Sequence, residues 1–121
     1  MNSLARLTVI ALLLTATNAG ANAFLDHAEP AAGSTINTPP TEIKIWFTEN
    51  PEPALSQIQL FDHRGKPLTQ NKAVVDSDDP TLLKLSIPVL KPGEYKVSWK
   101  VVSADLRMTV GTFSFNIRKS R

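Results

Sequence analysis

The chain contains no cysteine, and it has only two histidines and two methionines among 121 residues. Small exported domains often rely on disulfides. Because this chain has no cysteine, it has to hold its fold by packing and hydrogen bonds. Without thiols there is no cysteine nucleophile and no thiolate ligand, and two histidines cannot supply the four Cys or His ligands of a structural zinc site. Met108 is the only methionine besides Met1, which excludes a soft-metal site built from several thioethers.

Signals of catalysis are also scarce. Two histidines allow few combinations of serine, histidine and acid, and His63 lies in a predicted turn between Asp62 and Arg64. No glycine-rich phosphate loop follows a predicted strand. The acidic run at 76–79 lacks the glycine and the glutamate that an EF-hand calcium loop requires. We therefore expect that the protein is not an enzyme.

No apolar run reaches the roughly 20 residues that are needed to span a bilayer. Residues 7–14 form a short apolar run that follows Arg6 and precedes small residues at 16–23. A basic start, a short apolar middle and an Ala-x-Ala end are typical of an export signal. We predict a cleaved signal peptide at 1–23.

The small residues offer two cleavage sites. A cut after Ala21 leaves Asn22 as the first residue, and a cut after Ala23 leaves Phe24. Both fit the cleavage rule, so the sequence does not choose between them. Either cut leaves one domain of about 100 residues, at 24–121, which is near the commonest domain length.

The charge of the mature domain argues against a nucleic-acid partner. The formal net charge is +2, and loss of the leader removes only Arg6, so the mature domain is close to neutral. Nucleic-acid binding needs a clustered basic face. The only basic cluster is the tail at 118–121, which we interpret as a solvated end.

Alternating apolar and polar residues predict an all-β domain. Residues 42–48 place Ile43, Ile45 and Phe47 on one face, and 95–101 repeat the pattern, which is the period of a half-buried strand. Further strands are predicted at 24–28, 57–61, 73–75, 82–87 and 113–117. Turn signals recur about every 8 to 12 residues, which is typical of a sandwich. We predict an immunoglobulin-like β-sandwich of about seven strands with no disulfide.

Two aromatic residues are interpreted as structural. Residues 90–95, Leu-Lys-Pro-Gly-Glu-Tyr, resemble a tyrosine corner, in which the hydroxyl of Tyr95 bonds back to the main chain. Trp99 lies on the inward phase of its predicted strand. We therefore expect Trp99 in the core and not stacked on a ligand.

Three segments carry a resemblance to a known family. They are FLDHAEPAAGS at 24–34, PPTEIKIWFT at 39–48, and LKPGEYKVSWKVVSAD at 90–105 followed by GTFSF at 111–115. In order and spacing they resemble the CopC family of periplasmic copper-binding proteins. The resemblance implies a small Greek-key β-sandwich or barrel in the periplasm. It also implies copper(II) as the bound ion and an inner-membrane copper transporter of the CopD type as a partner; we expect a monomer.

The resemblance also implies where copper binds. Similar family members begin with a histidine that gives its amine and ring to the metal, and a Ser-x-Asp-x-His segment adds a carboxylate and a second imidazole. Nitrogen and oxygen ligands of this kind suit copper(II). In this chain the two histidine positions hold Asn22 and Arg107, whereas Asp105 is kept. A guanidinium does not ligate a metal, so we expect Arg107 to pair with Asp105.

The predicted metal ligands are therefore few. They are Asp105, the terminal amine of Asn22 if the cut follows Ala21, and His27 as a weak candidate. Alternation places His27 and Glu29 on the same strand face. Two hypotheses follow: a copper-homeostasis protein of the CopC type with weakened affinity, or a metal-free scaffold or interaction module that kept the fold and lost the copper site.

Overall fold

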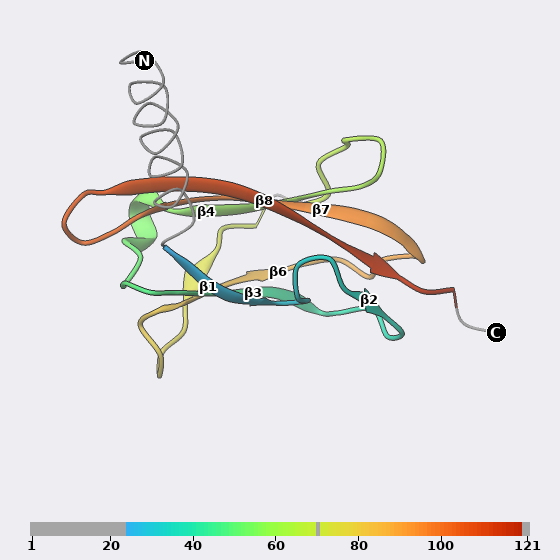
Figure 1. Cartoon of the computed structure of the whole chain (residues 1–121), viewed down its shortest axis with the longest axis horizontal. Coiled ribbons are helices and arrows are strands. Elements are labelled where there is room, and N and C mark those ends of the chain that lie inside the picture. Colours follow the sequence, from blue (N-terminus) through green and yellow to red (C-terminus); the bar gives the residue numbers. More distant parts are fainter. Residues whose placement is uncertain (1–23, 70, 120–121) are drawn as a thin grey trace, which may run out of the picture.

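The computed structural model describes residues 24–69 and 71–119, which form two four-stranded β-sheets packed face to face (Figure 1). In spatial order, the first sheet contains β1 (Leu25–Glu29), β3 (Glu42–Phe47), β6 (Leu82–Ser86) and β5 (Val74–Val75). The second sheet contains β2 (Thr35–Ile36), β8 (Met108–Ile117), β7 (Gly93–Val102) and β4 (Gln57–Phe61). A 3-10 turn, η1 (Pro53–Leu55), precedes β4. Neighbouring strands are antiparallel except β2 and β8, which are parallel.

The predicted all-β sandwich is confirmed, and each of the predicted strands is present. Strand β2 was not predicted, because two residues are too few to show alternation. Strand β8 begins at Met108, before the predicted start at 113. The sequence did not indicate this longer strand, because Gly111 interrupts the inward apolar pattern and Val110 faces outward. The predicted signal peptide and its cleavage sites lie outside the described residues. Within the described part of the chain, no helix is long and apolar enough to cross a membrane.

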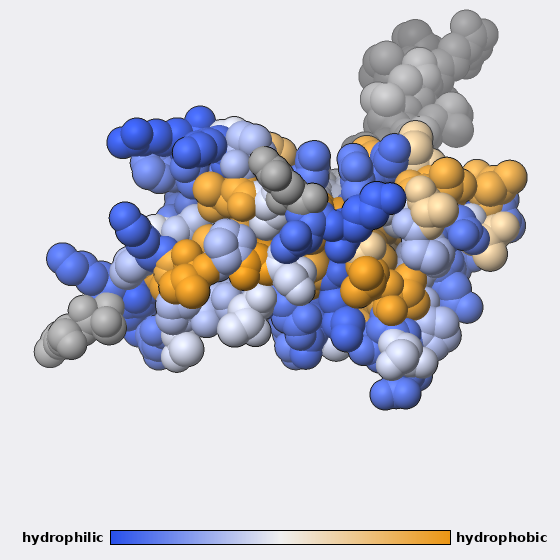
Figure 2. Space-filling view, turned by 180° about the vertical axis from the view of Figure 1, so that it is seen from behind, coloured by the Kyte–Doolittle hydropathy of each residue, from blue (hydrophilic) through white to orange (hydrophobic). Residues whose placement is uncertain are grey.

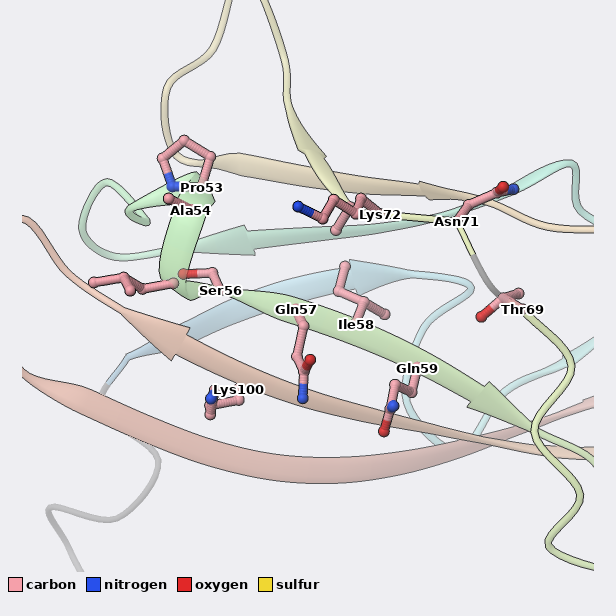
Figure 3. Close-up of a pocket in the computed structure, with 12 residues that line it drawn as sticks. Pro53, Ala54, Ser56, Gln57, Ile58, Gln59, Thr69, Asn71, Lys72 and Lys100 are labelled. Carbon is pink, nitrogen blue, oxygen red and sulfur yellow. The ribbon is translucent and has the colours of Figure 1, made fainter.

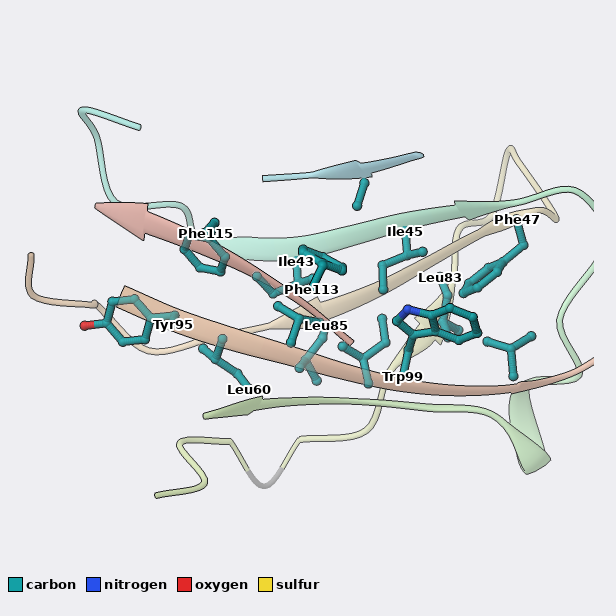
Figure 4. Packing of buried hydrophobic residues seen from close by; sticks show 14 of the residues in the cluster. Ile43, Ile45, Phe47, Leu60, Leu83, Leu85, Tyr95, Trp99, Phe113 and Phe115 are labelled. Atoms are coloured by element: carbon teal, nitrogen blue, oxygen red, sulfur yellow. The ribbon is translucent and has the colours of Figure 1, made fainter. Parts of the chain in front are cut away.

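The core lies between the two sheets, where inward side chains from both meet (Figure 4). Its most deeply buried members include Ile43, Ile45, Leu60, Leu83, Leu85, Val97, Val101 and Phe115. Trp99 is 3% exposed, and its ring meets Phe47 edge-on with centroids 5.5 Å apart, which confirms its predicted place in the core. In the absence of disulfides, this apolar burial is the main favourable contribution to folding.

The predicted tyrosine corner is present. The hydroxyl of Tyr95 donates a hydrogen bond to the main-chain carbonyl of Lys91 at 2.6 Å, and the Tyr95 ring stacks near Phe115. This bond fixes the crossover from β6 in the first sheet to β7 in the second. Strands β7 and β8 then pair along their whole length, from Gly93 opposite Ile117 to Val102 opposite Met108. The turn between them projects from one end of the sandwich, at the left of Figure 1.

Candidate functional site

The turn that joins β7 to β8 is organised around Ser103, a polar residue that is only 1% exposed. Its main-chain N–H donates to the carbonyl of Arg107 at 2.9 Å, and its carbonyl accepts from the N–H of Leu106 at 2.9 Å. The Ser103 hydroxyl donates to the Asp105 carboxylate and accepts from the N–H of Arg107 at 3.2 Å. Leu106 takes a φ of +65°, a conformation that is costly for a residue with a side chain. The turn is therefore held in one shape by bonds to a buried hydroxyl.

Arg107 bridges two carboxylates across this turn. Its Nε donates to Asp105 Oδ2 at 3.0 Å, which confirms the predicted ion pair. Its terminal nitrogen Nη2 donates to Oε2 of Glu49, 58 positions earlier in the chain. The segment after β3 reaches this turn because Pro51 forms a β-bridge with Ser103. Glu49 was not among the predicted site residues, because nothing local in the sequence links it to Arg107.

The charges in this cluster reinforce one another. The Ser103 hydroxyl, followed by the charge of Arg107, lowers the pKa of Asp105 below its usual value. The negative charges of Asp105 and Glu49 raise the pKa of Arg107. Asp105 and Arg107 therefore stay ionised at neutral pH. The guanidinium already pairs with both carboxylates that a metal ion would use.

We expect the contribution of Asp105 to stability to disappear in acid. Its pKa is lower in the folded state, so this contribution is fully present above the unfolded pKa and is lost as the pH falls through the folded pKa. The Asp105→Asn variant lacks this contribution at every pH. The difference in free energy of unfolding between wild type and variant should therefore shrink as the pH falls below about 4. Urea denaturation at several pH values measures it, and a difference that stays constant over this range would contradict the expectation.

The start of the described chain lies beside this cluster. Leu25 is opposite Phe47 in the β1–β3 ladder, and the N–H of Thr48 donates to the carbonyl of Phe24 at 2.8 Å. Thr48 is followed directly by Glu49, the partner of Arg107. Asn22 itself is outside the described residues. The fold nevertheless carries Phe24 to the end of the sandwich where Asp105 and Arg107 lie.

His27 lies on the outer face of the first sheet. Its ring stacks on Trp46, with centroids 4.3 Å apart and planes at 8°, and its Nδ1 lies 2.8 Å from Oδ2 of Asp26. Glu29 is also exposed and lies beyond the buried Ala28, as the alternation predicted. Among residues 24–69 and 71–119 there is no group of three or more His, Asp or Glu side chains placed to hold a metal ion. The structure thus joins Asp105 to Arg107 and Glu49, and it does not add His27 to them.

A cavity of about 430 Å³ opens elsewhere, between β4 and a wall that includes Thr69 and residues 71–73 (Figure 3). Its wall is largely polar and includes Gln57, Gln59, Lys72 and Lys100. None of the predicted site residues lines it. The cavity therefore gives no support to a ligand site that includes Asp105 or His27.

The described residues define a small β-sandwich without disulfides, in which a charged turn lies next to the start of the first strand. Residues 25–118 match the CopC domain. The chain therefore belongs to the CopC family, as the resemblance of its sequence segments predicted.

Solved structures and curated relatives agree with this assignment. The chain is similar to CopC from Methylosinus trichosporium OB3b, with 32% identity, a TM-score of 0.76, and coverage of 81% of this chain and 95% of that one. It is also similar to PcoC, described as a methionine-rich copper resistance protein from Escherichia coli, with 26% identity, a TM-score of 0.71, and coverage of 78% and 97%. Copper resistance protein C of Xanthomonas campestris pv. juglandis is 28% identical, over 91% of each chain.

Proposed function

We propose that this protein is an exported copper-homeostasis protein that binds or delivers copper in the periplasm with weakened affinity. Its family membership supports the proposal, as do relatives named for copper resistance. A relative named Copper transport protein CutJ, from Bacillus subtilis, is 24% identical over 83% of this chain, although the match spans 19% of that protein. The predicted leader supports export, and the proposed partner is an inner-membrane transporter of the CopD type.

The proposed copper site lies at the turn between β7 and β8. Asp105 and Glu49 supply carboxylates there, and a cut after Ala21 adds the terminal amine of Asn22 two residues before Phe24. Carboxylate and amine donors suit copper(II), and His27 is a further candidate ligand.

The single observation that supports a weakened copper affinity is the pairing of Arg107 with both Asp105 and Glu49. Its guanidinium occupies both carboxylates, so a copper ion has to displace a paired cation before it can bind. Among the described residues, no third metal ligand lies close enough to make up for the competition from Arg107. The residues present therefore fit a low-affinity site better than a permanent one.

A copper(II) titration followed by electron spin resonance tests this proposal on the processed protein, with its first residue fixed by mass. We expect weak, saturable binding that Asp105→Asn reduces further. Nitrogen hyperfine structure from an imidazole should be present if His27 is a ligand. It should disappear in His27→Asn and persist in His63→Asn, the matched change in the other histidine. Nanomolar affinity in the wild type would contradict the proposed weakening.

The second candidate function is a metal-free scaffold or interaction module. The completeness of the Arg107 network favours it, because both carboxylates already have a cationic partner. The same titration separates the two functions. An absence of saturable copper binding in correctly processed protein supports the module and contradicts the copper proposal.

A further inference from the structure

Strand β8 has one edge that is only partly covered. On its other side it pairs with β7 along its whole length. On this edge, β2 and the residues before it reach only the last part of the strand: Gly33 N–H donates to the Ser114 carbonyl, Asn116 N–H to Ser34, and Arg118 N–H to Ile36. These bonds show that the even-numbered residues of β8 direct their main-chain groups toward this edge.

Met108, Val110 and Thr112 are the even-numbered residues that β2 does not reach. Their N–H and C=O groups therefore face the same edge, and no main-chain partner for them is found among the described residues. Six adjacent main-chain groups in one row are a template for another strand.

The uncovered stretch also lacks the features that usually protect an edge strand. Residues 108–113 contain no charged residue and no proline. Met108 and Val110 are each 62% exposed, and the neighbouring Leu106 is more exposed still. Apolar side chains are visible at the end of the molecule that carries the β7–β8 turn (Figure 2). An apolar, uncharged edge of this kind favours pairing with an extended chain.

We propose that this edge of β8 pairs with the same edge of a second copy of the chain, and this proposal replaces the monomer expected from the sequence. In an antiparallel pair, hydrogen bonds form only between residues whose main-chain groups both face the shared edge, so even-numbered residues have to meet even-numbered ones. A twofold axis at Val110 places Val110 opposite Val110 of the second copy and Met108 opposite Thr112. This register uses all six main-chain groups of each copy.

The side chains fit this register. Val110 meets its own copy on the outer face of the joined sheet, and β-branched residues suit such cross-strand pairs. Arg107 falls opposite Phe113, so no like charges oppose each other along the pair. A symmetric contact requires a self-complementary patch, which this stretch provides. The hydrogen bonds of this pair come from Met108, Val110 and Thr112, none of which is a proposed copper ligand, so the dimer can be tested without copper.

Substitution of the residue at the axis tests the dimer. We expect the processed wild type to show a concentration-dependent dimer in analytical ultracentrifugation. Val110→Lys should weaken it at least about tenfold, because two lysines then face each other across the axis. Val89→Lys is the matched control, since Val89 is 93% exposed outside the strands and should leave the dimer unchanged. A wild type that stays monomeric, or a dimer that survives Val110→Lys, overturns the proposal.

A cysteine cross-link tests the register directly, because the chain has no cysteine of its own. Directly opposed residues in a hydrogen-bonded antiparallel pair have Cα atoms about 5.5 Å apart, which is within the range that a disulfide spans. Val110→Cys should therefore form a disulfide-linked dimer rapidly under mild oxidation, and Val89→Cys should not. Equal rates for the two variants would contradict the register.

Discussion

Replacing Asn22 and Arg107 together by histidine is expected to tighten copper(II) binding at least about a thousandfold, or about 4 kcal/mol. Arg107→His removes the cation that occupies Asp105 and Glu49 and puts an imidazole in its place. Asn22→His adds a second imidazole to the terminal amine, provided that the cut follows Ala21. Imidazole is a strong copper(II) ligand, so the gain comes both from lost competition and from added donors.

A matched pair of variants separates these two effects. The Asn22→Gln/Arg107→Gln protein removes the guanidinium and adds no imidazole, so it should gain only the part that comes from lost competition. Competition against a copper chelator of known affinity measures both variants, and the spin-resonance spectrum reports the nitrogen ligands. If the histidine variant binds no more tightly than the glutamine variant, the turn between β7 and β8 does not hold copper in the proposed way.

Trp99→Ala is expected to lower the free energy of unfolding by about 3 to 5 kcal/mol. The indole is buried between Phe47 and the main chain of Gly111. Its removal leaves a cavity in a domain that has no disulfide to limit unfolding. Domains of this size are typically stable by about 5 to 15 kcal/mol, so the change is a large fraction of the total.

The close contact between Gly111 and the Trp99 ring allows a second, more specific test of this packing. A Cβ atom at Gly111 would lie 2.5 Å from Cζ2 of Trp99, closer than packed atoms approach. Gly111→Ala should therefore cost about 1 to 3 kcal/mol in the wild type. In a Trp99→Ala background the same change should cost much less, because the opposing ring is gone. Urea denaturation followed by circular dichroism measures the cycle, with the exposed neighbour Thr112→Ala as control. Equal costs of Gly111→Ala in the two backgrounds would contradict the contact.

The sequence was sufficient to predict the fold wherever burial alternates with exposure. Strands β3 and β7 show this period over their whole length, and the Tyr95 corner has a local signature. The Asp105–Arg107 pair was also predictable, because the two residues lie two positions apart. Glu49 was not, because its approach depends on how β3 leads into the segment that meets Ser103. The open edge of β8 depends in the same way on where β2 stops, which no local pattern records.

The two ends of the domain lie far apart, and this decides how the protein can be handled. Strand β8 begins at Met108 beside the charged turn and ends at Ile117, about 30 Å away by the rise of an extended strand. An affinity tag or a surface anchor fused after the C-terminal residue therefore stays clear of Asp105. A histidine tag placed ahead of Phe24 would instead put foreign imidazoles next to the turn, and the metal affinity measured would then be that of the tag.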